Sequence, residues 1–228
     1  MPSASSIRAL CLLGLLSVGF GCLNGCAVVG VVGEKLLTQD PVVPAAYVPP
    51  RDTMLVLVEN FQNPASVTEL SERVDRQVTY QLVQHRVAPI VNPDRLVELR
   101  QGKSRLYDKM EIAAIGRAVG AKQILYADLV DFTVEPALNV PMARGHAEAR
   151  VRVIDAATGE TRWPQESRAG YPVKAQTPFV ELKEGVTEQT VEQQVGLQLS
   201  DSIAKLFYKS TSERPEGAEG FQTPLTGQ

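Results

Sequence analysis

Cysteine is absent from the sequence after residue 26. The 228 residues include only three cysteines, Cys11, Cys22 and Cys26, and all of them lie close to the amino terminus. The rest of the chain therefore cannot be a disulfide scaffold, and it cannot hold a cysteine-based zinc site.

Basic clusters are also lacking. The chain has 23 Lys and Arg residues against 26 Asp and Glu, for a formal net charge of -3. These charges are scattered, whereas a nucleic-acid-binding face needs a basic stripe. We therefore expect no nucleic-acid partner. The hydrophobic fraction of 44% is ordinary for a globular protein with a packed core.

Histidine is rare, which limits acid-base chemistry. The two histidines are His85, which we interpret as a cap at a helix end, and His146, which we interpret as a surface residue of a strand. No serine has a plausible base, so a Ser-His-Asp hydrolase is not expected. Asp128 and Asp131 are three residues apart in a predicted strand, which would place them on opposite faces. We predict no catalytic residues, no metal ligands and no cofactor, and hence no enzyme.

The amino terminus has the pattern of an export signal. Arg8 is the only charge in the first 33 residues, and it precedes an apolar run, residues 9–20, that is too short to span a bilayer. The sequence Leu-Asn-Gly-Cys at 23–26 resembles a bacterial lipobox, so we predict a signal peptide over residues 1–25 and lipidation of Cys26. Cys22 is the alternative. A secretory signal without lipidation is a further alternative.

Four segments follow from composition. After the signal peptide (1–25), residues 26–51 form a lipid-anchored tether that is proline-rich from 41, residues 52–209 form one α/β domain, and residues 210–228 form a disordered tail. Two acyl chains such as palmitate would anchor the protein stably, at about 0.8 kcal/mol per buried methylene.

The domain is predicted to be α/β (α+β), with a single mixed sheet and helices in the order β-α-β-α-β-β-β-α. Period-2 and continuous apolar patterns indicate the strands, and period-3.6 patterns with caps indicate the helices. A further short helix follows the second strand. The predicted strands are 54–58, 87–91, 123–134, 147–153 and 160–163, and the predicted helices are 66–85, 92–99, 108–119 and 187–207.

Three stretches resemble the curli-secretion lipoprotein family (CsgG-like) and its relatives, the TolB amino-terminal domain and the lipoprotein activators of peptidoglycan synthases. Residues 55–61 look like the first strand of these proteins, residues 115–128 like their helix, glycine-alanine turn and strand, and residues 151–160 like their hairpin. The resemblance implies a periplasmic, non-enzymatic domain. The connections at 135–145 and 161–179 do not suit the membrane hairpins of a curli-type pore, since the first is too short and the second carries prolines and charges.

These observations predict a lipid-anchored periplasmic lipoprotein that acts as a non-enzymatic protein-binding adaptor in envelope assembly or export. Its partners would be the membrane, through the amino-terminal lipid, an unidentified envelope protein, and further copies of the chain as a homo-oligomer. Ala27 follows the preferred cysteine where a retention aspartate could stand, which favours the outer membrane. The alternatives are an oligomeric curli-type secretion channel component and an envelope enzyme acting on a glycan or peptide.

Overall fold

The computed structural model describes residues 42–60, 68–102, 104–107 and 109–211. Contacts divide the chain into two units, Met1–Val42 with Thr211–Gln228, and Val43–Ser210. The second unit contains nearly all described residues and is the domain discussed below. The predicted signal peptide, Cys22, Cys26 and most of the predicted tether and tail lie outside the described residues, so the lipidation site and the boundaries at 52 and 209 stay predictions.

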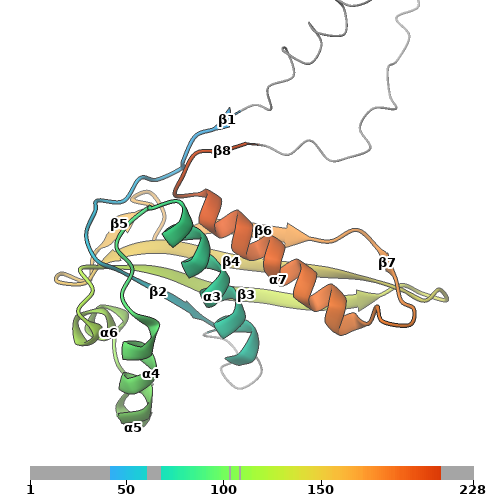
Figure 1. Cartoon of the computed structure of the whole chain (residues 1–228), viewed down its shortest axis with the longest axis horizontal. Coiled ribbons are helices and arrows are strands. Elements are labelled where there is room, and N and C mark those ends of the chain that lie inside the picture. Colours follow the sequence, from blue (N-terminus) through green and yellow to red (C-terminus); the bar gives the residue numbers. More distant parts are fainter. Residues whose placement is uncertain (1–41, 61–67, 103, 108, 212–228) are drawn as a thin grey trace, which may run out of the picture. The chain divides into compact units, whose positions relative to one another are not determined.

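The predicted α+β class is confirmed by a mixed six-stranded sheet with helices (Figure 1). Its strands are β2 (Met54–Glu59), β3 (Gln123–Pro136), β4 (Met142–Asp155), β5 (Thr161–Trp163), β6 (Tyr171–Gln176) and β7 (Val180–Glu181). Two further strands, β1 (Val42–Val43) and β8 (Ser210–Thr211), pair in a separate two-stranded sheet. The helices are α3 (Thr68–Gln84), α4 (Pro93–Gly102), α5 (Ser104–Tyr107), α6 (Ile112–Val119) and α7 (Glu188–Lys205).

The long strands β3 and β4 form the centre of the sheet. They pair antiparallel along most of their 14 residues each, and β2 joins the first part of β3 in parallel. The strands β5, β6 and β7 all pair with the other side of β4. As a result, among the described strands β3 has a neighbour on both sides only as far as Asp128, which pairs with Glu59 at the end of β2.

Helices α3 and α7 cover one face of the sheet (Figure 1). The predicted helical stripes are confirmed, because the residues at those positions are buried in one cluster with the inward residues of β4. These residues are Leu70, Val74, Val78 and Leu82 of α3, Val195, Leu199 and Ile203 of α7, and Ala147, Ala149, Val151 and Val153 of β4. Gly145 of β4 allows α7 to approach closely, since a Cβ there would lie 2.7 Å from Val195 Cγ1.

A second, smaller core lies on the opposite face of the sheet. Leu55 and Leu57 alternate with the β2 residues of the first core, so they point to this other face. They pack with apolar residues of α4, α6 and the start of β3, among them Ile124. The left-handed Gly120 (φ 82°) ends α6, as the sequence predicts. Helix α6 itself begins after Glu111 rather than at the predicted residue 108.

The predicted strand 87–91 is wrong as a strand. Only Ile90 forms a bridge, parallel to Met54. The Met54 N–H donates to the Pro89 carbonyl at 2.8 Å, and the Val91 N–H donates to the Met54 carbonyl at 2.9 Å. Proline has no N–H to continue a ladder, which explains why pairing stops after one bridge. Strands β6 and β7, which the sequence analysis missed, lie in the segment that follows β5.

Candidate functional site

Charged residues gather on the part of the second face that the small helices leave open. The register of β3, β4 and β6 places them side by side, because directly paired residues share a face. We name this surface the charged sheet face. Its members are Asp128, Asp131 and Glu135 of β3, Arg144, His146, Glu148, Arg150 and Arg152 of β4, and Lys174 of β6.

The expectation that Asp128 and Asp131 lie on opposite faces is wrong. Asp128 pairs with Arg150 and Asp131 pairs with Glu148, and these two partners are themselves two residues apart on one face of β4. The register shifts between Leu129 and Asp131, so one extra residue of β3 is accommodated there. Such a bulge reverses the alternation of side chains, which brings both aspartates onto the charged sheet face.

Ion pairs link these residues across the strands. Glu148 lies at their centre with 14% of its side chain exposed. Its carboxylate oxygens lie 3.0 Å from Arg150 Nη2 and 3.2 Å from Lys174 Nζ. Toward the hairpin turn, His146 Nε2 lies 3.6 Å from Asp131 Oδ2, and Arg144 forms two bonds to Glu135 Oε2 at 2.8 and 3.0 Å. His146 is therefore a half-buried residue beside Asp131 rather than a fully exposed surface residue.

Tyrosine and arginine side chains surround Glu59 at the end of β2. The Tyr107 hydroxyl donates to Glu59 Oε1 at 3.1 Å, and Arg100 lies 4.0 Å from the same oxygen and 5.2 Å from the centre of the Tyr107 ring. Burial, together with the Glu59 charge, raises the pKa of Tyr107 to about 12. The hydroxyl therefore stays protonated at neutral pH and serves as a donor that fixes α5 to the sheet.

Asp75 is the titratable group most displaced toward neutral pH. It lies partly buried on α3, where the Thr79 hydroxyl donates to Asp75 Oδ1 at 3.2 Å. Burial raises the pKa of this carboxyl to about 7, against the opposing effects of the Thr79 hydrogen bond and of Arg100 and Arg76. The Asp75 carboxyl therefore gains and loses its proton near neutral pH.

Aromatic rings connect the two ends of the described domain to its body. His85 lies just beyond the end of α3, as predicted. Its ring also stacks on that of Tyr208, with ring centres 3.6 Å apart. Trp163 stacks with Tyr47, with ring centres 5.8 Å apart, and with Tyr171, at 5.1 Å. Tyr47 belongs to the predicted tether, and this contact holds that part of the chain against β5.

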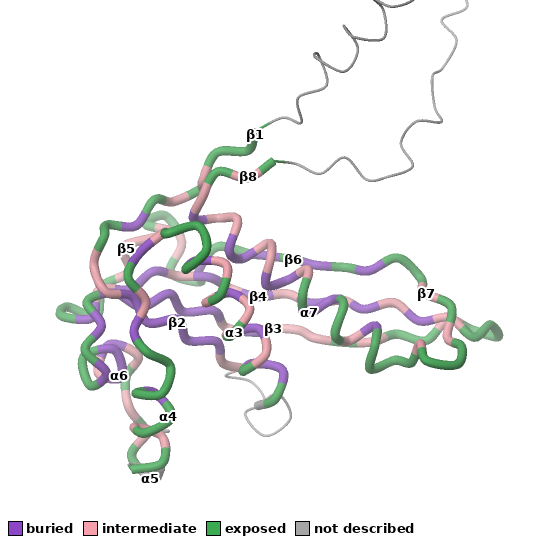
Figure 2. The backbone as a smooth tube through the Cα atoms, viewed as in Figure 1, coloured by how far each residue is buried: buried purple, intermediate pink, exposed green. Residues whose placement is uncertain are grey.

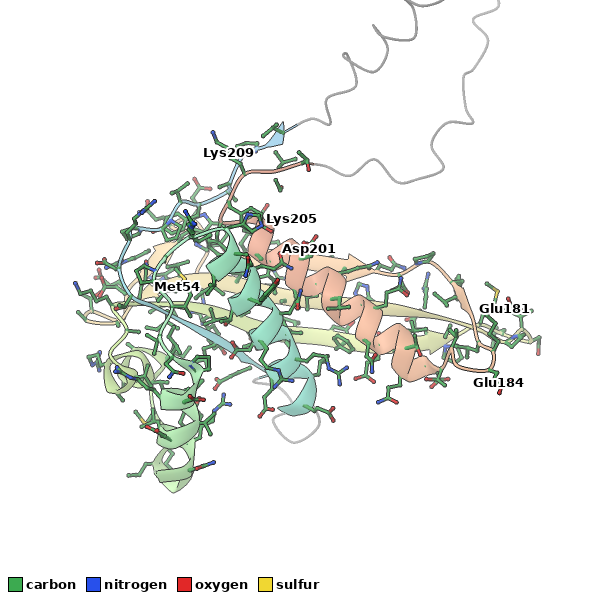
Figure 3. The ribbon with its side chains drawn as sticks, viewed as in Figure 1. Met54, Glu181, Glu184, Asp201, Lys205 and Lys209 are labelled. Atoms are coloured by element: carbon green, nitrogen blue, oxygen red, sulfur yellow. The ribbon has the colours of Figure 1, made fainter. Side chains whose placement is uncertain are left out.

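An open depression of about 690 Å³ lies where β7 leads into α7. It is lined by Leu182, Lys183, Val186, Thr187, Glu188 and Gln189. Figure 3 shows Glu181 and Glu184 in the same connection, beside the turn of the β3–β4 hairpin. Within the described ranges, no three His, Cys, Asp or Glu side chains are grouped so that they could hold a metal ion. None of the described helices combines the length and apolar character needed to cross a membrane.

These features define an α+β domain with helices packed on one sheet face and an ionic network on part of the other. No protein-family model and no curated protein matches the sequence. Several solved structures are distantly similar. They include a PelC dodecamer from Paraburkholderia phytofirmans (10% identity, covering 75% of this chain and 100% of that chain, TM-score 0.35) and lipoprotein GNA1162 from Neisseria meningitidis (11% identity, covering 66% and 99%, TM-score 0.42). A minor lipoprotein from Acinetobacter baumannii is another (9% identity, covering 68% and 91%, TM-score 0.38). At these TM-scores the similarity assigns no family.

Proposed function

We propose that this protein is a lipid-anchored envelope protein, held at the outer membrane with its domain facing the periplasm, and that it is a non-enzymatic adaptor. The anchor follows from the lipobox at Cys26 and the apolar export segment before it. The charged sheet face binds the partner protein.

The observation that carries the adaptor role is the accessibility of this ionic network on a rigid sheet. Lys174 has 65% of its side chain exposed and Asp131 has 45%, while their backbone is fixed within paired strands. Glu148, at the centre, is only 14% exposed. Fixed charges of both signs complement a partner surface in one orientation, and such complementarity confers specificity and fast association.

Site-directed photocrosslinking in cells tests the adaptor role. A crosslinking amino acid at Lys174 samples the charged sheet face, and one at Gln193, an exposed residue of α7, samples the opposite side as a control. We expect a discrete adduct with one envelope protein from position 174 that position 193 does not give. The Arg150→Glu substitution should weaken that adduct. Equal adducts from both positions, or none from 174, would refute the proposal.

Mass spectrometry of the mature amino terminus tests the anchor. We expect a diacylated cysteine at residue 26 and loss of membrane association in Cys26→Ser, while Cys22→Ser, the matched control, is processed normally. A mature chain that begins at residue 22, or one that keeps residues 1–25, contradicts this assignment.

A further inference from the structure

Beyond the end of β2, the six-stranded sheet has β3 at one edge and β6 at the other, and these two strands differ in how their open edges are protected. Strand β6 pairs with β4 on one side, and it carries Pro172 and Lys174, residue types that natural proteins place on edge strands to prevent further pairing. Strand β3 beyond Asp128 borders no described strand on the side away from β4. Its bulge lies before Asp131 and its proline, Pro136, is its last residue, so residues 131–135 between them contain neither a bulge nor a proline or lysine. Figure 1 shows this part of β3 continuing along the sheet past the end of β2.

The open part of β3 is long enough to accept another strand. Five residues span roughly 17 Å, and alternate residues direct both their N–H and their C=O toward the open side. Thr133 and Glu135 are exposed, and Val134 is half-buried. Figure 2 shows that the part of β3 beyond the end of β2 is largely half-buried or exposed. Because backbone hydrogen bonds along such an edge give affinity without fixing the partner's sequence, side chains must supply the selectivity.

The charges on β3 indicate which side chains would fit. Every ionisable side chain of β3 on the charged sheet face is acidic, namely Asp128, Asp131 and Glu135, whereas Arg144 and Arg150 are among their partners on β4. A strand added on the open side therefore meets a row of carboxylates on one face. On its other face it meets Phe132, which packs against the main core, and Val134.

We infer that residues 131–135 of β3 bind an extended peptide of a partner protein, in which Lys or Arg alternates with apolar residues, as an added strand of the sheet. This rests on the proposed protein-binding role. A second copy of the chain is a poorer occupant, because antiparallel pairing of two β3 edges about Thr133 would set Asp131 opposite Glu135 of the other copy. Like charges in directly opposite positions destabilise a strand pair.

A direct binding measurement tests the inference with the full mature chain. The probe is a fluorescent seven-residue peptide of alternating valine and lysine, and the control peptide has the same composition with its valines and lysines in blocks. We expect the alternating peptide to bind at least about ten-fold more tightly, measured by fluorescence anisotropy. Equal binding of the two peptides would refute the inference.

N-methylation separates strand addition from simple charge attraction. Two further peptides carry N-methyl groups on the odd or the even residues, which removes the donors on one side of the extended chain and leaves its charge unchanged. Strand addition requires that one of them loses binding about ten-fold while the other keeps it. If both bind alike, the peptide is held by charge alone and the inference fails.

Protein variants locate the site. The double change Asp131→Asn with Glu135→Gln should weaken binding about five-fold, since each exposed carboxylate contributes modestly. The matched control, Glu181→Gln with Glu184→Gln, alters two acidic residues near the same end of the sheet (Figure 3) and should change binding less than two-fold. Equal losses in the two double variants contradict the assignment.

Hydrogen exchange of the free chain tests whether another segment of this chain, or a second copy of it, already covers the open edge of β3. We expect the backbone amides of residues 131–135 to be less protected than those of 147–153 in β4, and to gain protection when the peptide is added. Full protection in the dilute free chain would mean that another segment of this chain already covers the edge. Protection that rises with protein concentration would mean that a second copy does. Either result overturns the inference, whereas failure of the cellular crosslink at Lys174 would count against the proposed adaptor role alone.

Discussion

Replacing Asp75 with asparagine should stabilise the protein at high pH. Burial raises the pKa of this carboxyl from 3.8 to about 7, so the folded state disfavours the ionised form. A raised carboxyl pKa means that the folded protein holds a proton that the unfolded chain releases. The free energy of unfolding therefore falls as the pH rises from about 4 to about 7, and the full cost remains above that range.

The magnitude follows from the size of the shift. About three pKa units correspond to an upper limit of about 4 kcal/mol at 1.36 kcal/mol per unit, and partial exposure of the side chain reduces this to about 1–3 kcal/mol. Asparagine keeps an oxygen to accept the 3.2 Å hydrogen bond from Thr79. The Asp75→Asn variant should thus exceed the unmodified protein by about 1–3 kcal/mol at pH 8.5, and the gain should disappear near pH 4.

Urea unfolding followed by Trp163 fluorescence at pH 4, 6 and 8.5 measures this difference. The control is Asp201→Asn on α7, where the exposed carboxylate pairs with Lys205 at 2.6 Å (Figure 3). That change should cost at most about 0.5 kcal/mol at pH 8.5. The reasoning about Asp75 is refuted if its variant is no more stable than the unmodified protein at pH 8.5, or if the gain does not depend on pH.

Two further changes test the packing and the turns. Gly116→Ala should destabilise the protein by about 1–3 kcal/mol, because the new Cβ would lie 2.6 Å from Ile124 Cδ1. The control Gly102→Ala, whose Cβ would have no described neighbour within 4 Å, should stay within about 0.5 kcal/mol, and the same urea unfolding assay measures both. Asp155→Ala should cost about 1 kcal/mol at pH 7, since the Thr158 N–H, Arg162 and the Ala157 N–H hold the pKa of this carboxyl near 2. A lowered pKa gives stability that is present above about pH 4 and lost as the pH falls toward 2, so the cost of the substitution should shrink over that range, and a constant cost would contradict it.

Local patterns sufficed for the elements whose burial repeats regularly. The continuous apolar run of β2 is buried on both faces, and the alternation in β4 from Ala147 to Val153 matches one buried and one accessible face. Helix α7 begins after Thr187, where Thr190 completes a capping box. In each case the order of apolar and polar side chains within one segment indicates its secondary structure and its buried face, so the element can be predicted from the sequence alone.

The strands that were missed depend on a partner rather than on their own pattern. Strand β6 alternates, with Val173 and Ala175 buried, but it is short and Pro172 within it argues against a strand, and β7 has only two residues. Both exist because β4 is long enough to offer them its second side. The single bridge at Ile90 is the reverse case, since its apolar residues look like a strand but Pro89 limits the pairing.

The charged sheet face could not be predicted for the same reason, because it depends on how two strands pair. From sequence spacing, Asp128 and Asp131 belong to different faces, and nothing in the intervening residues marks the bulge that unites them. The bulge is a property of the pairing between β3 and β4, because it appears only when one strand accommodates a residue that the other lacks. The bulge also determines on which face of the sheet every later residue of β3 lies. Without it, Asp131 and Glu135 would point into the core beneath α7, and Phe132 would be on the solvent side. The acidic row at the open edge of β3, and with it any selectivity for basic peptides, therefore depends on a single inserted residue.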